Sequence, residues 1–80
     1  GAVEAVADLI NTIDRLDTGA LNKDSLENIT RQLFQRGLTR PVTPDEWNVI
    51  DKMQQQQPRR QAIEDTLWVI INHPEFGVRP

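Results

Sequence analysis

His73 is the only histidine of the chain, and histidine is the side chain best suited to acid–base chemistry near neutral pH. General acid–base catalysis also requires a pocket in which partner groups tune the pKa of the catalytic side chain. His73 directly precedes Pro74, which disfavours helical backbone at the residue before it. A histidine at a helix end more commonly binds main-chain carbonyls or faces solvent. The chain has no HExxH motif and no glycine-rich phosphate loop, so we predict no catalytic residue and no enzyme activity.

A calcium site is the first metal possibility to consider. Residues 14–25 place an aspartate first and a glycine sixth in a twelve-residue segment, as in an EF-hand loop. Such a loop needs oxygen ligands at its third and fifth positions and a bidentate carboxylate at its twelfth. Those positions hold Leu16, Thr18 and Ser25, and leucine cannot coordinate calcium. The chain also has no cysteine for a thiolate site. We therefore expect no metal and no cofactor.

Aromatic and cationic side chains are the remaining candidates for binding. Trp47 and Trp68 could stack against sugars or bases, but each lies in an apolar helical pattern, so we expect both to pack in the core. Arg59 and Arg60 are the only adjacent basic residues, and they could contact an anion, although a solvated pair is expected. The possible interaction residues are therefore Trp47, Trp68, Arg59, Arg60 and His73.

Length and composition restrict the class of protein. Eighty residues suffice for one domain with one core. The nine basic and twelve acidic residues leave a net charge of −3, which disfavours sequence-independent binding to nucleic acid. No apolar run approaches the ~20 residues that a membrane span requires. We expect no nucleic acid and no membrane span, and we expect residues 1–80 to form a single helical domain that belongs to a longer protein.

Apolar residues recur every three or four positions in four segments, which indicates amphipathic helices. We predict helices over about residues 2–16, 23–36, 44–55 and 58–73. Short connections between them predict an all-α fold, a small four-helix bundle whose helix order and handedness stay open. The residues expected in the core share the helical spacing: Val3, Val6, Leu9, Ile10, Ile13, Leu16, Leu26, Ile29, Leu33, Phe34, Trp47, Val49, Ile50, Met53, Ile63, Leu67, Trp68, Ile70 and Ile71.

Capping residues mark the ends of the predicted helices. Asn22 or Asp24 is expected to cap the second helix, and Gly37 is expected just beyond its end, where a left-handed conformation is common. Thr43 and Glu46 have the spacing of a capping box at the start of the third helix.

Two stretches, LFQRGLTRPVTPDEW at 33–47 and AIEDTLWVIINHPEF at 62–76, resemble part of a known family. They are similar to the C-terminal region of a planctomycete-specific family of exported proteins of unknown function, often found with planctomycete cytochrome C domains. The resemblance implies an exported protein, periplasmic or at the cell surface, and it brings no catalytic residues with it. The chain departs from the family pattern by carrying His73 and by ending in Gly77-Val78-Arg79-Pro80. The matching positions are Leu33, Phe34, Arg36, Leu38, Arg40, Pro41, Thr43, Pro44, Glu46, Glu64, Asp65, Leu67, Trp68, Asn72, Glu75 and Phe76.

These observations favour a non-enzymatic helical domain that packs against, or helps to assemble, a larger exported bacterial protein. Its partner would be another domain of the parent protein or a separate protein. Two alternatives stay open. One is a small ligand-binding or glycan-binding module that uses an exposed tryptophan. The other is an accessory part of an enzyme, in which His73, Glu64, Asp65 or Glu75 completes a site built mainly by another domain.

Overall fold

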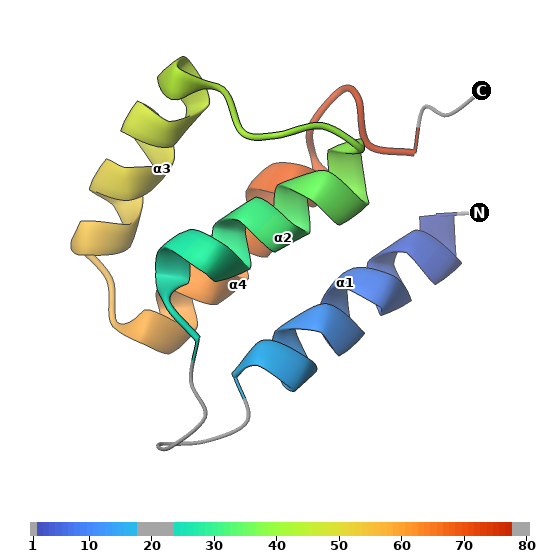
Figure 1. Cartoon of the computed structure of the whole chain (residues 1–80), viewed down its shortest axis with the longest axis horizontal. Coiled ribbons are helices and arrows are strands. Elements are labelled where there is room, and N and C mark those ends of the chain that lie inside the picture. The colour runs from blue at the N-terminus through green and yellow to red at the C-terminus, as the bar shows by residue number, and fades with distance from the viewer. Residues whose placement is uncertain (1, 18–23, 78–80) are drawn as a thin grey trace.

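The computed structural model describes residues 2–17 and 24–77, and this part of the chain forms four α-helices (Figure 1). They are α1 (Ala2–Leu16), α2 (Leu26–Leu38), α3 (Pro44–Gln55) and α4 (Arg59–Ile71). The predicted all-α four-helix bundle is thereby confirmed. The first and third helices have the predicted bounds. The second begins and ends later than predicted, and the fourth is shorter at both ends.

The helices are arranged around a central pair. α2 packs against α4, and this pair is flanked by α1, which contacts both, and by α3, which packs against α4. In Figure 1, α1 and α3 therefore lie on opposite sides of α2. Each outer helix has neighbours on one side only, so part of its surface is left open to solvent.

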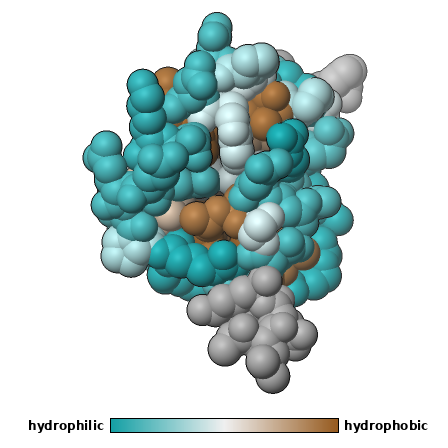
Figure 2. Space-filling view, turned by 60° about the vertical axis from the view of Figure 1, so that its left-hand side comes forward, coloured by the Kyte–Doolittle hydropathy of each residue, from teal (hydrophilic) through white to brown (hydrophobic). Residues whose placement is uncertain are grey.

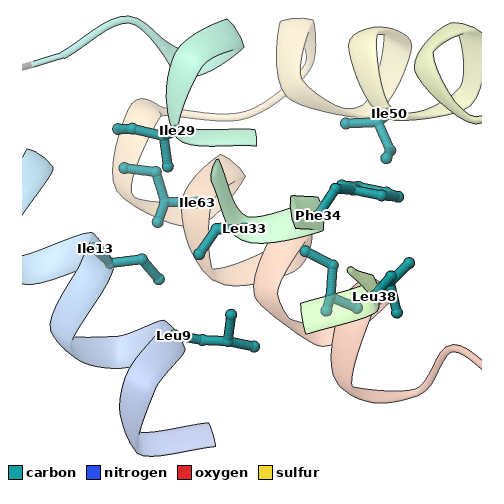
Figure 3. Packing of buried hydrophobic residues seen from close by; sticks show 9 residues of the cluster. Leu9, Ile13, Ile29, Leu33, Phe34, Leu38, Ile50 and Ile63 are labelled. Carbon is teal, nitrogen blue, oxygen red and sulfur yellow. The ribbon is translucent and has the colours of Figure 1, made fainter. Parts of the chain in front are cut away.

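The core consists of aliphatic side chains from all four helices and of one fully buried aromatic ring, that of Phe34. Phe34 of α2 is fully buried, and Figure 3 shows it beside Ile50, which attaches α3 to the core. Phe76, which follows α4, also packs against the cluster. The buried hydrophobic residues of the cluster are Leu9, Ile13, Ile29, Leu33, Phe34, Leu38, Ile50, Ile63 and Ile70.

Four residues expected in the core are instead exposed, and the prediction was wrong for Val3, Ile10, Val49 and Trp68. The apolar stripes of their helices are wider than the surface that neighbouring helices cover. Periodicity identifies an apolar stripe, but it does not show how much of the stripe a neighbour contacts. The exposed members of these stripes are candidates for contact with another molecule.

Gly37 does not follow α2 as predicted but lies buried inside it. A Cβ atom added at Gly37 would lie 2.5 Å from Ile70 Cγ2, so the missing side chain lets α2 approach α4 closely. The left-handed residue at the end of α2 is Thr39, with φ 58°. A β-branched residue in this region is strained, and the Thr39 hydroxyl donates a hydrogen bond to the Leu38 carbonyl at 2.6 Å.

The start of α2 is capped by Ser25, whose Oγ accepts a hydrogen bond from the Asn28 N–H at 3.0 Å. Asp24 was predicted as a possible cap, but its carboxylate instead accepts the Ser25 N–H at 2.8 Å. The other predicted cap, Asn22, lies outside the described residues.

A buried hydrogen-bond network links α3 to both central helices. The Gln54 side-chain amide donates to the Thr30 hydroxyl of α2 at 2.7 Å and to the Thr66 hydroxyl of α4 at 3.0 Å. Each threonine in turn donates to a carbonyl one turn earlier in its own helix, Leu26 or Ala62, at 2.7 Å. Since buried polar groups are costly unless paired, this network favours one position of α3 on the bundle.

Candidate functional site

An apolar groove, which we call the α3–α4 groove, opens between these two helices. Its volume is about 420 Å³, and Phe34 and Ile50 of the core contribute to its lining. Val49 of α3 is 71% exposed and Val69 of α4 is 41% exposed, so both walls present hydrophobic side chains to water. Figure 2 brings the side of α3 forward, and hydrophobic residues are visible there between hydrophilic ones. The described lining residues are Phe34, Asp45, Glu46, Val49, Ile50, Met53, Val69 and His73.

Helical spacing explains why these side chains share the groove. Glu46, Val49 and Met53 follow one another at intervals of three and four along α3, so they occupy one side of that helix. Val69 lies near the end of α4, and His73 follows that helix by two residues. Val69 and His73 line the groove opposite the row on α3. Glu46 and His73 thus place polar groups at the end of the groove where α3 begins.

A cluster of four charged or titratable side chains, Arg40, Glu46, His73 and Glu75, closes that end. We call it the Arg40 cluster. Arg40 donates to the two Glu75 carboxylate oxygens from Nε at 2.9 Å and from Nη2 at 3.0 Å. It donates to the two Glu46 oxygens from Nη1 and Nη2, both at 2.8 Å, and from Nη1 to the Pro41 carbonyl at 3.0 Å. A guanidinium has five N–H donors, so Arg40 is fully occupied by acceptors of its own chain.

His73 has both ring nitrogens engaged in the cluster. Its Nδ1 accepts the backbone N–H of Glu75 at 3.1 Å, and its Nε2 lies 3.2 Å from Glu46 Oε2. Because an accepting nitrogen carries no proton, the neutral ring holds its proton on Nε2 and donates it to Glu46. Arg40 Nη2, at 3.4 Å from Nε2, is then a neighbouring donor and not a hydrogen-bond partner. The expectation that His73 caps carbonyls or faces solvent was wrong.

Glu46 is the residue that joins the cluster to the helix start. The predicted capping box is confirmed, since Thr43 Oγ1 accepts the Glu46 N–H at 3.2 Å and Glu46 Oε1 accepts the Thr43 N–H at 2.9 Å. Hydrogen bonds from Arg40, followed by those from Thr43, lower the pKa of Glu46 to about 2. Arg40 also lowers the pKa of Glu75, and the two glutamates raise the pKa of Arg40. Arg40, Glu46 and Glu75 are therefore ionised at neutral pH.

The two tryptophans lie outside the groove lining. Trp47 is half-buried, and the Arg31 guanidinium carbon lies 5.6 Å from its ring centroid, within the range of a cation–π contact. Trp68 is 63% exposed, so its predicted place in the core was wrong. The structure does not bring these two possible interaction residues together with the Arg40 cluster in one site.

The adjacent arginines have different surroundings. Arg59 donates to Asp17 Oδ1 from Nη2 at 2.8 Å and to the Asp24 carbonyl at 2.6 Å. These contacts hold the residues on either side of segment 18–23 to the start of α4. Arg60 is exposed, as expected. A solvated arginine pair was predicted, and this prediction was wrong for Arg59.

Among residues 2–17 and 24–77, no group of three His, Asp or Glu side chains is arranged to hold a metal ion. In the same residues, no helix has the length and apolar character needed to cross a bilayer.

No protein-family model matches this sequence, and comparisons with curated proteins and with solved structures also return no match. The resemblance to the planctomycete family therefore stays a prediction. Function has to be inferred from the groove and the side chains around it.

Proposed function

We propose that this chain is a non-enzymatic helical interaction domain of a larger exported bacterial protein, and that its α3–α4 groove receives apolar side chains of a protein partner. The observation that carries the proposal is the pair of exposed valines, Val49 and Val69, on facing walls of an apolar groove. Burying such surface yields roughly 25 cal/mol per Å², and grooves between helices commonly bind amphipathic helices. Export and bacterial origin come from the family resemblance alone.

The contacts of the polar residues support a structural role for the Arg40 cluster. His73 has a hydrogen-bond partner at each ring nitrogen. Arg40 has an acceptor for each of its donors, and Glu46 remains ionised at neutral pH because its pKa is about 2. A group that catalyses proton transfer has a pKa near the working pH and access to its substrate. The cluster instead links the segment after α4 to the start of α3 through hydrogen bonds and ion pairs.

A neutral apolar probe tests whether the groove accepts a ligand. Titration of ¹⁵N-labelled domain with 4-phenylbutan-1-ol is expected to give saturable amide shifts in residues 46–53 and 69–73, because the phenylalkyl chain can displace water from Val49 and Val69. The double variant Val49→Asp, Val69→Asp should lose these shifts, since charges in the walls would have to be desolvated. Val3→Asp, which alters an exposed valine of α1, should retain them. Shifts that centre on α1, or that survive the double variant, would contradict the proposal.

The exposed ring of Trp68 favours a second candidate function, a glycan-binding surface. Trp68 lies on the exposed side of α4, where the Asn72 side chain donates to the Trp68 carbonyl at 2.9 Å. Stacking of a sugar on an indole ring needs such an accessible aromatic face. The groove is the better candidate because it is concave, as ligand sites usually are.

Tryptophan fluorescence separates the two candidates. Iodide is expected to quench the wild-type domain strongly and Trp68→Phe only weakly, because Trp68 is exposed whereas Trp47 is half-buried beside Arg31. Soluble chito-oligosaccharides and cello-oligosaccharides, added in place of iodide, should leave the Trp68 emission unchanged. Saturable changes in that emission, absent from Trp68→Phe, would favour the glycan-binding function over the proposed one.

A further inference from the structure

We infer that the partner segment carries a cationic side chain next to its apolar residues, and that this cation binds where Asp45 and the Arg40 cluster form the end of the groove. The inference rests on the proposed function and specifies the chemistry of the partner. Among the described residues that line the groove there are two carboxylates, Asp45 and Glu46, and no lysine or arginine. Apolar and acidic groups thus lie side by side on one concave surface.

The charges at this end do not cancel. Glu46 and Glu75 share the single guanidinium of Arg40. No cationic side chain of residues 2–17 or 24–77 lies within ion-pair distance of Asp45. His73 contributes no charge in the neutral form that its hydrogen bonds indicate. Glu46 and Glu75 thus pair with one guanidinium while Asp45 lines the groove without an ion pair among the described residues, so these four side chains leave a formal net charge of −2 at this end.

Two local effects modify this charge. The positive end of the α3 dipole, equivalent to roughly half an elementary charge, offsets part of it. The apolar walls have the opposite effect, because charges interact more strongly where water is displaced by groups of low polarity. The net field still favours a cation, and a like charge brought to this end would be repelled. An arginine or lysine beside the apolar anchors of a partner helix fits both parts of the surface.

Three probes that share one phenylalkyl chain test the inference. They are 4-phenylbutylamine, which is cationic, 4-phenylbutan-1-ol, which is neutral, and 4-phenylbutanoate, which is anionic. We expect the amine to bind about threefold more tightly than the alcohol at low ionic strength, as for an exposed ion pair. The carboxylate should bind most weakly. The amine alone should also shift the amide of Asp45, and its advantage should disappear at ~1 M salt, where the Debye length is about 3 Å.

Matched variants separate a local charge from the charge of the whole domain. Asp45→Asn removes the exposed carboxylate at the groove, and Asp14→Asn removes an exposed carboxylate of α1. Both change the net charge equally, but only Asp45→Asn should abolish the preference for the amine. Dispersed amide spectra of both variants establish that they are folded, because neither residue is buried.

The possible outcomes distinguish the inference from the function on which it rests. Equal binding of all three probes in the groove, or a preference for the carboxylate, would overturn the inference and leave the proposed function standing. An amine preference that both variants reduce equally would also overturn it, because the effect would then come from net charge. Absence of binding in the groove by all three probes would overturn the proposed function as well.

Discussion

Gly37→Ala is expected to lower the free energy of unfolding by about 1–2 kcal/mol, although alanine is the better helix former. The gain in helix propensity is about 1 kcal/mol. Against it, the new Cβ would lie 2.5 Å from Ile70 Cγ2, in a place where both residues are buried. Overpacking a core typically costs about 1–3 kcal/mol, and the upper part of this range applies because a methyl group on a branched Cβ cannot swing away. Urea denaturation measures the change.

The matched control moves the clashing methyl group. Ile70→Leu keeps the side-chain volume but transfers the branch from Cβ to Cγ, which removes Cγ2. In this background Gly37→Ala should be neutral or stabilising, because only the propensity gain of about 1 kcal/mol remains. A double-mutant cycle should then give a coupling free energy between Gly37→Ala and Ile70→Leu. Its sign should be opposite to that of the stability change caused by Gly37→Ala alone. If Gly37→Ala destabilises both backgrounds equally, close approach of α2 to α4 is not the reason for glycine at this position.

Acidification is expected to remove about 1–2 kcal/mol of stability through Glu46. Its pKa falls from an ordinary value of 4.5 to about 2 in the folded domain, mainly because Arg40 donates to its carboxylate. A carboxylate with a lowered pKa stabilises the folded state above its unfolded pKa, and that contribution is lost as the pH falls through the folded value. The loss therefore occurs between about pH 5 and pH 2. This loss of stability is expected to be smaller than the value that the pKa shift alone would give, because solvent screens the charges of the cluster.

Glu46→Gln isolates this contribution. Glutamine at the third helical position also completes a capping box, so the variant removes the charge and keeps the helix cap. Urea denaturation from pH 7 to pH 2 should give a flatter dependence for Glu46→Gln and lower stability at pH 7. Glu64→Gln, which changes an exposed carboxylate outside the Arg40 cluster, serves as the control. An unchanged pH dependence in Glu46→Gln would show that the Arg40–Glu46 ion pair does not stabilise the domain.

Local patterns in the sequence were sufficient to predict the helices. The bounds of α3 were predicted correctly because Thr43 and Glu46 determine where a helix begins through contacts three residues apart. Gly37 shows the limit of such reasoning. Glycine suits both a residue beyond a helix end and a close contact between helices, and a single sequence does not distinguish these two uses. α2 therefore ends at Leu38, two residues beyond the predicted end, and Thr39 is its C-cap.

The candidate site could not be predicted in the same way. Arg40 and Glu75 are 35 positions apart, and no spacing rule relates them. Val49 was assigned to the core because it belongs to an apolar row of α3, but periodicity does not show how much of such a row a neighbouring helix covers, and Val49 is exposed. The size of the groove is thus a property of how the helices pack, whereas its hydrophobic character is already visible in the sequence.

The Gln54 network has a consequence for selectivity. If α3 slid by one turn along its neighbours, the side-chain amide would face aliphatic groups without a bonding partner, at a penalty of about 1–3 kcal/mol. Alternative registers of α3 are thereby disfavoured, which favours one position of Val49 relative to Val69. Under the proposed function, a groove that is preorganised in this way would spend little binding free energy on its own ordering, and it would select partner helices by the size of their anchor residues.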